Sequence, residues 1–150
     1  MRVVLQRVTS ASCTVDGVIT GQIEKGYLLL VGFTNGDNEA KLDKAVKKIG
    51  GLRIFEDENG KMNLNLQTVG GNILSISQFT LYANTNDGNR PSFTEAMHPD
   101  YAKPLYLKFN EKLRNLGFIV EEGIFGAHML VSLENNGPFT IVLDSDEIIK

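Results

Sequence analysis

The sequence lacks the features that would place a protein in a membrane or outside the cell. Its longest unbroken apolar run, Tyr27 to Val31, is far shorter than the ~20 residues that a membrane-spanning helix needs. A single Arg2 precedes a short apolar stretch at the N-terminus, and polar residues follow it at once, so we expect no secretory signal. The one cysteine, Cys13, has no partner for an internal disulfide and is interpreted as a small buried hydrophobe. These absences predict a cytoplasmic protein that does not contact a membrane.

The sequence also lacks an excess of positive charge. Its 15 Lys and Arg residues are outnumbered by 18 Asp and Glu residues, which gives a net charge of -3. A domain that binds nucleic acid over a broad surface is normally basic, so we predict no DNA binding, and any RNA must be held locally, by one end. Lys41, Lys44 and Lys48 form a basic stripe on the first predicted helix, interpreted as a solvated face with phosphate contact as the alternative.

What the sequence does contain is the pattern of a mostly β protein. The length of 150 residues fits one domain over residues 1–150, and 42% hydrophobic and 22% charged residues are ordinary for a globular chain. Alternating and continuous apolar runs predict strands at 2–8, 12–15, 18–23, 26–33, 52–56, 72–81, 118–122, 129–133 and 139–143. Helical spacing predicts helices over 38–49 and 99–116. The predicted fold class is an α+β sheet or barrel.

The segment Ser77-Gln78-Phe79-Thr80-Leu81 carries polar groups where a structural strand would use apolar ones. Period-two alternation places Ser77 on one face and Gln78 and Thr80 on the other, so neither face is purely apolar. The simpler interpretation is a half-exposed strand. The alternative is a strand end that offers backbone N–H groups and a hydroxyl to a reacting carbonyl, as an oxyanion hole does. The segment alone leaves both open.

A second segment, Asn136-Gly137-Pro138-Phe139-Thr140, lies between two apolar runs. Asn-Gly is a strong hairpin signal, so the simpler interpretation is a β-turn joining two strands. The alternative uses the fixed backbone of Pro138 and the missing Cβ of Gly137. Such a pair at a loop tip can present main-chain carbonyls to a ligand with no side chain in the way.

Neither segment supplies a strong acid, a strong base or a metal ligand. His98 and His128 are far apart in the sequence, with no Cys or carboxylate at metal-ligand spacing, so we expect no metal site. The order of residues leaves a Ser-His-Asp triad open, but no nucleophile-elbow motif accompanies it. The glycine pairs match no nucleotide-binding fingerprint, and we predict no cofactor. An enzyme with these groups must depend on geometry, which favours hydrolysis of an ester that is already activated.

Together, these segments resemble the D-aminoacyl-tRNA deacylase family over essentially the whole chain. The resemblance is carried by the stretches Arg2–Val8, Leu52–Asp57, Gly60–Leu64, Ser77–Leu81, Arg90–Phe93, Phe125–Ala127 and Asn136–Thr140. The chain departs from the family at His128, where an acidic residue is frequent. Asn136 and Phe139 replace an acidic residue and a smaller aliphatic one. Because Gly137-Pro138 is intact, these departures bear on substrate preference more than on activity.

The resemblance implies a barrel-like, mostly antiparallel sheet with two main helices, assembled as a homodimer with the active site at the subunit interface. The Gly137-Pro138 peptide, cis in the family, would reach into the pocket of the partner. The implied reaction is metal-independent hydrolysis of the ester at the 3′ end of D-aminoacyl-tRNA, with glycyl-tRNA as a second substrate. Such a reaction is chiral proofreading in translation.

The resemblance also implies roles for single residues. Backbone N–H groups around Phe79 and Thr80 would bind the developing oxyanion, while Ser77 and Gln78 would orient the substrate or the pocket. The Thr80 hydroxyl would act as a nucleophile or position a water, and we favour the water, activated with help from the ribose 2′-OH of the substrate. The carbonyls of Gly137 and Pro138 would hold the amino group, so that an L side chain meets the loop.

Two competing hypotheses remain from the sequence. An editing domain like those that clear L-amino acids from threonyl-tRNA would cleave L-Ser-tRNA without preferring D-amino acids. A non-catalytic RNA- or protein-binding module would keep the fold without the reaction.

Overall fold

The sheet is organised around its longest N-terminal strand, β1 (Arg2–Val15), in the computed structural model, which describes residues 1–148. Strand β8 (Leu130–Asp144) runs antiparallel along one edge of β1. On the other edge, β3 (Gly26–Gly32) pairs with the first half of β1 and β2 (Val18–Ile23) with the second half. The three antiparallel pairs form the larger part of a six-stranded sheet.

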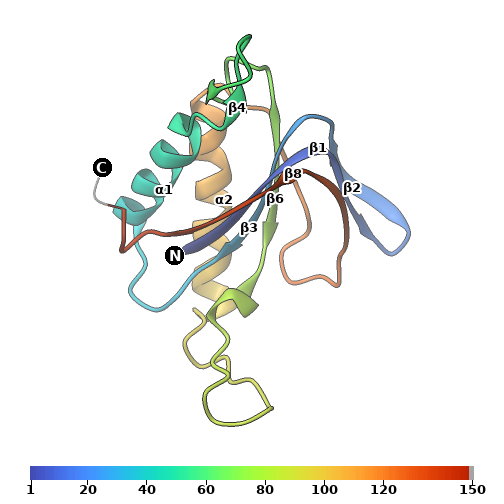
Figure 1. Ribbon diagram of the computed structural model, residues 1–150. Helices are drawn as coiled ribbons and strands as arrows, with labels where there is room; N and C mark the ends of the chain where they lie inside the picture. The colour runs from blue at the N-terminus through green and yellow to red at the C-terminus, as the bar shows by residue number, and fades with distance from the viewer. Residues whose placement is uncertain (149–150) are drawn as a thin grey trace.

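The remaining strands extend the sheet in a parallel direction. Strand β6 (Asn72–Ser77) is parallel to β3, and β7 (Val120–Glu122) is parallel to β6. Parallel neighbours need crossover connections, which here contain the helices α1 (Glu39–Gly51) and α2 (Pro99–Asn115). The helices lie beside one another on one side of the sheet, while β1, β2 and β8 curl away on the other (Figure 1).

This curl makes the sheet barrel-like. Strand β2 contacts β6 and β7 across the curl without pairing with them. Val8, Cys13 and Leu28 form a small apolar cluster with Leu74 and Ile76 inside the curl. A larger core lies between the sheet and the helices. The predicted α+β class, a barrel-like and mostly antiparallel sheet with two helices, is confirmed.

Local sequence signals account for the helix starts. The Asn38 side chain accepts a hydrogen bond from the Lys41 N–H at 3.2 Å and caps α1, and Pro99 opens α2. The buried side of α1 is the predicted stripe of residues at helical spacing: Leu42, Ala45, Val46 and Ile49. Within residues 1–148, no helix combines the length and the apolar content that a membrane span needs.

Several predicted strand boundaries were wrong. The predicted strand 72–81 ends at Ser77, where a 3₁₀ turn, η1 (Phe79–Tyr82), begins. The predicted strands 2–8 and 12–15 are one strand, and 118–122 shortens to Val120–Glu122. The stretch 52–56 contributes only β4 (Phe55–Glu56), which pairs with β5 (Met62–Leu64) in a separate ribbon. The interpretation of residues 1–150 as one domain stays a prediction.

The hairpin predicted around Asn136 was also wrong. Residues on both sides of Gly137-Pro138 pair with the same strand, β1, so the chain continues in one direction through them. The pairing register shifts on β1 between Gln6 and Val8, because the four residues 136–139 are accommodated opposite Arg7. The segment is therefore a bulge inside β8 rather than a turn between two strands.

The basic stripe on α1 is partly neutralised. Lys41 forms ion pairs with Asp37 at 3.3 Å and with Asp146 at 3.0 Å. The hydrogen bond with Asp146 is the main cause that raises the pKa of Lys41, and the same bond lowers the pKa of Asp146. Asp37 also binds the amino group of Met1 at 2.9 Å in a fully buried pair. Lys41 therefore has a structural role, while Lys44 remains exposed.

Candidate active site

The predicted segment Ser77–Leu81 lies where β6 leaves the sheet and enters η1. The Gln78 N–H donates to the Val31 carbonyl at 2.7 Å, which keeps the start of the turn against β3. No acceptor is found among residues 1–148 for the backbone N–H groups of Phe79 and Thr80, which open the 3₁₀ turn. Both residues are exposed. The turn thus presents two free N–H groups at the protein surface.

Two predicted side chains meet in this turn. The Gln78 amide Nε2 donates a hydrogen bond to the Thr80 Oγ1 at 2.5 Å. This bond fixes the direction of the Thr80 hydroxyl, whose own hydrogen is free to donate elsewhere. Ser77 is half-buried, and its hydroxyl forms no hydrogen bond within the described chain. The structure therefore brings Ser77, Gln78, Phe79 and Thr80 together in one turn.

Gly32, which the sequence analysis did not single out, allows β3 to approach this turn. A Cβ at residue 32 would stand 2.7 Å from the Gln78 carbonyl oxygen and 3.1 Å from the Leu81 Cβ. The first distance is shorter than real Cβ contacts and the second is tight, so a larger residue at position 32 would push the turn outward. A lone glycine in an apolar strand was the only signal in the sequence.

Arg2 holds the other end of the turn. One of its nitrogens donates to the Leu81 carbonyl at 2.9 Å, and the guanidinium lies 4.5 Å from the centre of the Tyr82 ring. Its Nε reaches Asp144 at the end of β8 at 3.3 Å. Burial is the main cause that raises the pKa of Tyr82, so this ring stays neutral. Arg2 thus links the turn to the sheet.

A cavity of about 830 Å³ opens beside the turn. Ser77, Gln78 and Phe79 form part of its wall. The rest of the wall is largely apolar and aromatic, and includes Phe33, Phe93, Met97, Ala102, Phe125, Met129 and Val131. Among residues 1–148, no Asp, Glu, Lys or Arg lines it, and its ionisable side chains are His98 and His128. The cavity can therefore take an uncharged, partly aromatic group next to the turn.

The loop of residues 83–98 forms one side of this cavity. It projects away from the body of the protein in Figure 1, between η1 and α2. Two hydrogen bonds hold its second half against the end of β3, from the Thr34 hydroxyl to the Glu95 carbonyl and from the Met97 N–H to the Phe33 carbonyl. The Phe93 ring packs edge-on against the Phe79 ring at 5.1 Å. Arg90, in the same loop, is exposed.

The second predicted segment forms the bulge in β8, which we define as residues 136–139. Asn135 closes its base, since its Oδ1 accepts the Phe139 N–H at 2.6 Å and its Nδ2 donates to the Phe139 carbonyl at 3.2 Å. The Gly137-Pro138 peptide bond is cis, and both residues are exposed. Residues 136–139 have no backbone pairing partner on β1, and no described side chain donates a hydrogen bond to the carbonyls of Gly137 or Pro138. The bulge therefore presents free carbonyls to solvent.

The side chain of Arg7, on the neighbouring strand β1, holds the bulge in place. Its Nε donates to the Asn136 carbonyl at 3.0 Å, another nitrogen donates to the Ile54 carbonyl at 2.5 Å, and the guanidinium packs 4.7 Å from the Phe139 ring centre. Arg7 is 8% exposed. Sequence analysis assigned Arg7 no role, although its place on the apolar face of β1 after Val3 and Leu5 was a usable signal.

The turn and the bulge do not meet within one chain. Through the sheet register, Ser77 lies beside Val31 and Val3, whereas the bulge lies beside Arg7. Four residues of extended strand separate Val3 from Arg7, which corresponds to about 13 Å. Accordingly, neither Gly137 nor Pro138 lines the cavity.

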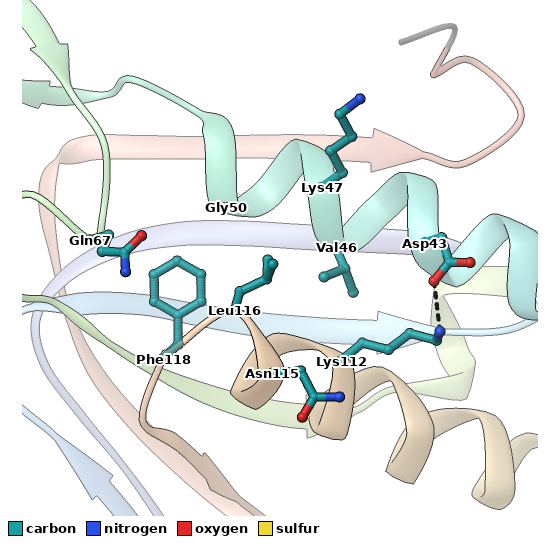
Figure 2. Close-up of a pocket in the computed structure, with 9 residues that line it drawn as sticks. All are labelled: Asp43, Val46, Lys47, Gly50, Gln67, Lys112, Asn115, Leu116 and Phe118. Carbon is teal, nitrogen blue, oxygen red and sulfur yellow. Dashed lines mark ion pairs between the residues drawn. The ribbon is translucent and has the colours of Figure 1, made fainter.

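A smaller hollow of about 420 Å³ lies between the two helices (Figure 2). Val46, Leu116 and Phe118 point into it, and Lys112 forms an ion pair with Asp43 at 2.7 Å across its rim. None of the predicted site residues lies there. Lys112 is partly buried and already paired, while Lys47, which also lines the hollow, is exposed.

The described part of the chain brings together neither a catalytic triad nor a metal site. Ser77 forms no hydrogen bond with His98 or His128 within residues 1–148, although all three line the same cavity. Over the same residues, no cluster of three or more His, Cys, Asp or Glu side chains is arranged to hold a metal ion.

Solved structures define the class of fold. A structure of a c-Myc DNA unwinding element binding protein superposes with a TM-score of 0.90 at 40% identity and covers 96% of this chain and 98% of its own. A probable eukaryotic D-amino acid tRNA deacylase gives a TM-score of 0.81 at 20% identity, over 95% of this chain and 97% of its own. The fold is therefore that of the D-aminoacyl-tRNA deacylase class.

Sequence comparison identifies the family. The profile of the family described as D-Tyr-tRNA(Tyr) deacylase matches residues 4–144. D-aminoacyl-tRNA deacylases of Lactobacillus acidophilus and Lactobacillus gasseri are 61% and 60% identical over 144 residues, which cover 96% of this chain and 99% of each relative. The chain belongs to the D-Tyr-tRNA(Tyr) deacylase family. This membership confirms the resemblance seen in the sequence and the prediction of a deacylase enzyme.

Proposed function

We propose that this protein hydrolyses the ester bond of D-aminoacyl-tRNA, which releases free tRNA and the D-amino acid. The observation that carries the proposal is the pair of free N–H groups on Phe79 and Thr80 at the edge of a cavity without fixed charge. Two converging donors at the position of a carbonyl oxygen stabilise the oxyanion that forms during ester hydrolysis. Family membership supplies the class of substrate.

The turn needs no strong base for this reaction. An aminoacyl ester is already labile in water, so orientation and oxyanion binding can supply the acceleration. The Thr80 hydroxyl, oriented by Gln78, is placed to donate to an attacking water or to the ester. The ribose 2′-OH of the substrate assists the water, and no acyl-enzyme forms. Detection of an acyl group on Thr80 by mass spectrometry of quenched reactions would contradict this mechanism.

The bulge supplies the selection between D- and L-amino acids. The exposed carbonyls of Gly137 and Pro138 accept hydrogen bonds from the substrate amino group, which fixes the α-carbon against the backbone. A D side chain then points to open space, whereas an L side chain meets the bulge, and each ~1.4 kcal/mol of clash is about tenfold in discrimination. Glycine has no side chain to reject, so glycyl-tRNA is a second substrate.

A second copy of the chain brings the two segments together. The bulge lies about 13 Å along the sheet from the turn of its own chain, so a homodimer in which each bulge enters the cavity of the partner completes both sites. Strand β8 supports this arrangement because, within residues 1–148, it pairs with β1 alone and exposes Leu130 (64%) and Val142 (66%). A long edge strand is a ready template for pairing with another chain.

The partner of the dimer is the 3′ end of aminoacyl-tRNA. With a net charge of -3, the protein holds this end locally rather than along a broad basic surface. Removal of D-amino acids from tRNA is a proofreading step for translation, and we expect it in the cytoplasm, where charged tRNA is used.

Paired deacylation of D-Tyr-tRNA and L-Tyr-tRNA, with and without a chelator, tests the proposal. Rapid loss of the D ester alone in both arms is the expected result. Cleavage of L-Ser-tRNA without D preference would favour the threonyl-type editing alternative. Loss of neither ester would favour the non-catalytic binding module.

A further inference from the structure

We propose that His98 and His128 bind the 5′-phosphate of the terminal nucleotide of the tRNA. The inference rests on the proposed function, because it assumes that the aminoacyl ester reaches the turn. Its starting observation is that these two histidines are the only ionisable side chains among the 21 residues that line the cavity. They come from separate elements, the start of α2 and the loop that leads into β8.

His98 is oriented to donate from its outer nitrogen. Its Nδ1 accepts a hydrogen bond from the Asp100 N–H at 3.1 Å, so the neutral ring carries its proton on Nε2. The Asp100 carboxylate lies 3.6 Å from the same Nδ1. The side chain is 65% exposed, and Nε2 has no partner within residues 1–148. A free N–H donor therefore stands at the mouth of the cavity.

His128 offers a second donor on another wall. The residue is exposed and lines the cavity with its neighbours Ala127 and Met129. Its ring forms no hydrogen bond or ion pair within the described chain. Two exposed imidazoles that line one cavity from different elements can approach an anion at its opening from two sides.

The chemistry of the substrate assigns these donors to phosphate. When the ester carbonyl lies at the turn, the adjoining ribose and base can occupy the aromatic wall made by Phe79, Phe93 and Phe125. The 5′-phosphate is then the one charged group of the terminal nucleotide, and it must lie toward solvent. Imidazole N–H groups bind phosphate oxygens through charge-assisted hydrogen bonds. Within residues 1–148, neither histidine forms a hydrogen bond with Ser77 or Thr80, which argues against a role in proton transfer.

Two minimal substrates test the inference: 3′-O-D-tyrosyl-adenosine with and without a 5′-phosphate. The wild type should show a KM about tenfold lower for the phosphorylated ester, the effect of about 1.4 kcal/mol of charge-assisted hydrogen bonding. The His98→Ala/His128→Ala double variant should lose this preference, with the change in KM rather than kcat. The His98→Gln/His128→Gln variant, which keeps an N–H donor at each position, should retain part of it.

Lys103→Ala, an exposed cation on α2 that does not line the cavity, is the matched control and should keep the full preference. The same variants are also assayed with D-Tyr-tRNA, where the double variant should again raise KM. Equal KM values for both esters in the wild type, an undiminished preference in the double variant, or a fall in kcat for both esters would overturn the inference. If the wild type cleaved none of these esters, the result would instead refute the proposed function.

Discussion

The turn at the end of β6 and the bulge in β8 are opposite in what they present. The turn leaves two N–H groups free beside a cavity, whereas the bulge leaves two carbonyls free on exposed residues. Each is held by an arginine from β1, Arg2 for the turn and Arg7 for the bulge. The difference shows that one chain carries two complementary halves of a binding site that it cannot join by itself.

The two halves also differ in how they are supported. The turn depends on the sheet, because β3 must approach it closely and Arg2 must link it to the end of β8. The bulge is largely self-contained, since Asn135 closes its base and, within residues 1–148, Arg7 is the one side chain of another strand that donates a hydrogen bond to it. Substitutions near the turn should therefore reduce the rate of ester hydrolysis, while substitutions near the bulge should reduce the discrimination between D- and L-aminoacyl-tRNA.

The largest effect is expected for Gly32→Ala. The added Cβ would stand 2.7 Å from the Gln78 carbonyl and displace the turn, and a displacement of this kind can cost about 100-fold in activity. The measurement is kcat/KM for D-Tyr-tRNA. Gly51→Ala, whose Cβ would meet nothing within 4 Å, is the control and should retain full activity. Unchanged activity of Gly32→Ala would show that the position of the turn is not critical.

Val142→Lys tests the need for a second copy. A charge on this exposed position of β8 should separate the proposed dimer, because like charges then face one another across its two-fold axis. Light scattering should report the monomer mass, and deacylation should fall by about tenfold. Met62→Lys on the β4–β5 ribbon is the control, with a similar exposure of 53%. A fully active monomer would contradict the shared site.

Arg7→Met should affect selection more than catalysis. The substitution leaves the Asn136 and Ile54 carbonyls without their donor, which should lower the free energy of unfolding by about 2 kcal/mol. The loosened bulge should raise cleavage of L-Tyr-tRNA relative to D-Tyr-tRNA by about tenfold. Thermal unfolding and paired deacylation measure the two effects. Lys25→Met, at an exposed cation whose side chain forms no hydrogen bond or ion pair within residues 1–148, should change neither, and an unaltered D/L ratio in Arg7→Met would refute the anchoring role.

The smallest effect concerns Asp57, which belongs to neither the turn nor the bulge. Hydrogen bonds, chiefly from the Lys61 N–H, lower the pKa of Asp57 in the folded protein. Its contribution to stability is therefore present above the ordinary aspartate pKa of about 3.9 and is lost as pH falls through the lowered value. Between pH 7 and pH 3, Tm should fall less in Asp57→Asn than in the wild type. Asp87→Asn, where the carboxylate accepts no hydrogen bond within residues 1–148, should follow the wild type.

Local signals in the sequence were sufficient to predict most of the helices and strands. The cap at Asn38 and the apolar stripe after it defined α1, and the continuous run from Gly26 defined the buried β3. The single path of β8 could not be predicted, because Asn-Gly is a hairpin signal and only pairing with β1 shows that the chain does not reverse. The parallel pairing of β6 with β3 could not be predicted either, because it joins segments that are far apart in the sequence.

The candidate site was predictable in part. Polar residues at Ser77 to Thr80 marked the turn, because a buried strand would have avoided them. The close approach of Gly32 and the meeting of His98 with His128 in one cavity depend on tertiary contacts between distant segments. No local pattern reports such contacts.

A subunit-mixing experiment tests the shared site most directly. Pro138→Ala, which should loosen the bulge and allow cleavage of L-Tyr-tRNA, is refolded with an excess of the inactive Gly32→Ala chain. In the mixed dimer, the intact turn comes from the Pro138→Ala chain and the intact bulge from its partner. Cleavage of L-Tyr-tRNA should then fall while cleavage of D-Tyr-tRNA persists. Undiminished cleavage of L-Tyr-tRNA, in dimers shown to be mixed, would mean that each bulge serves its own chain.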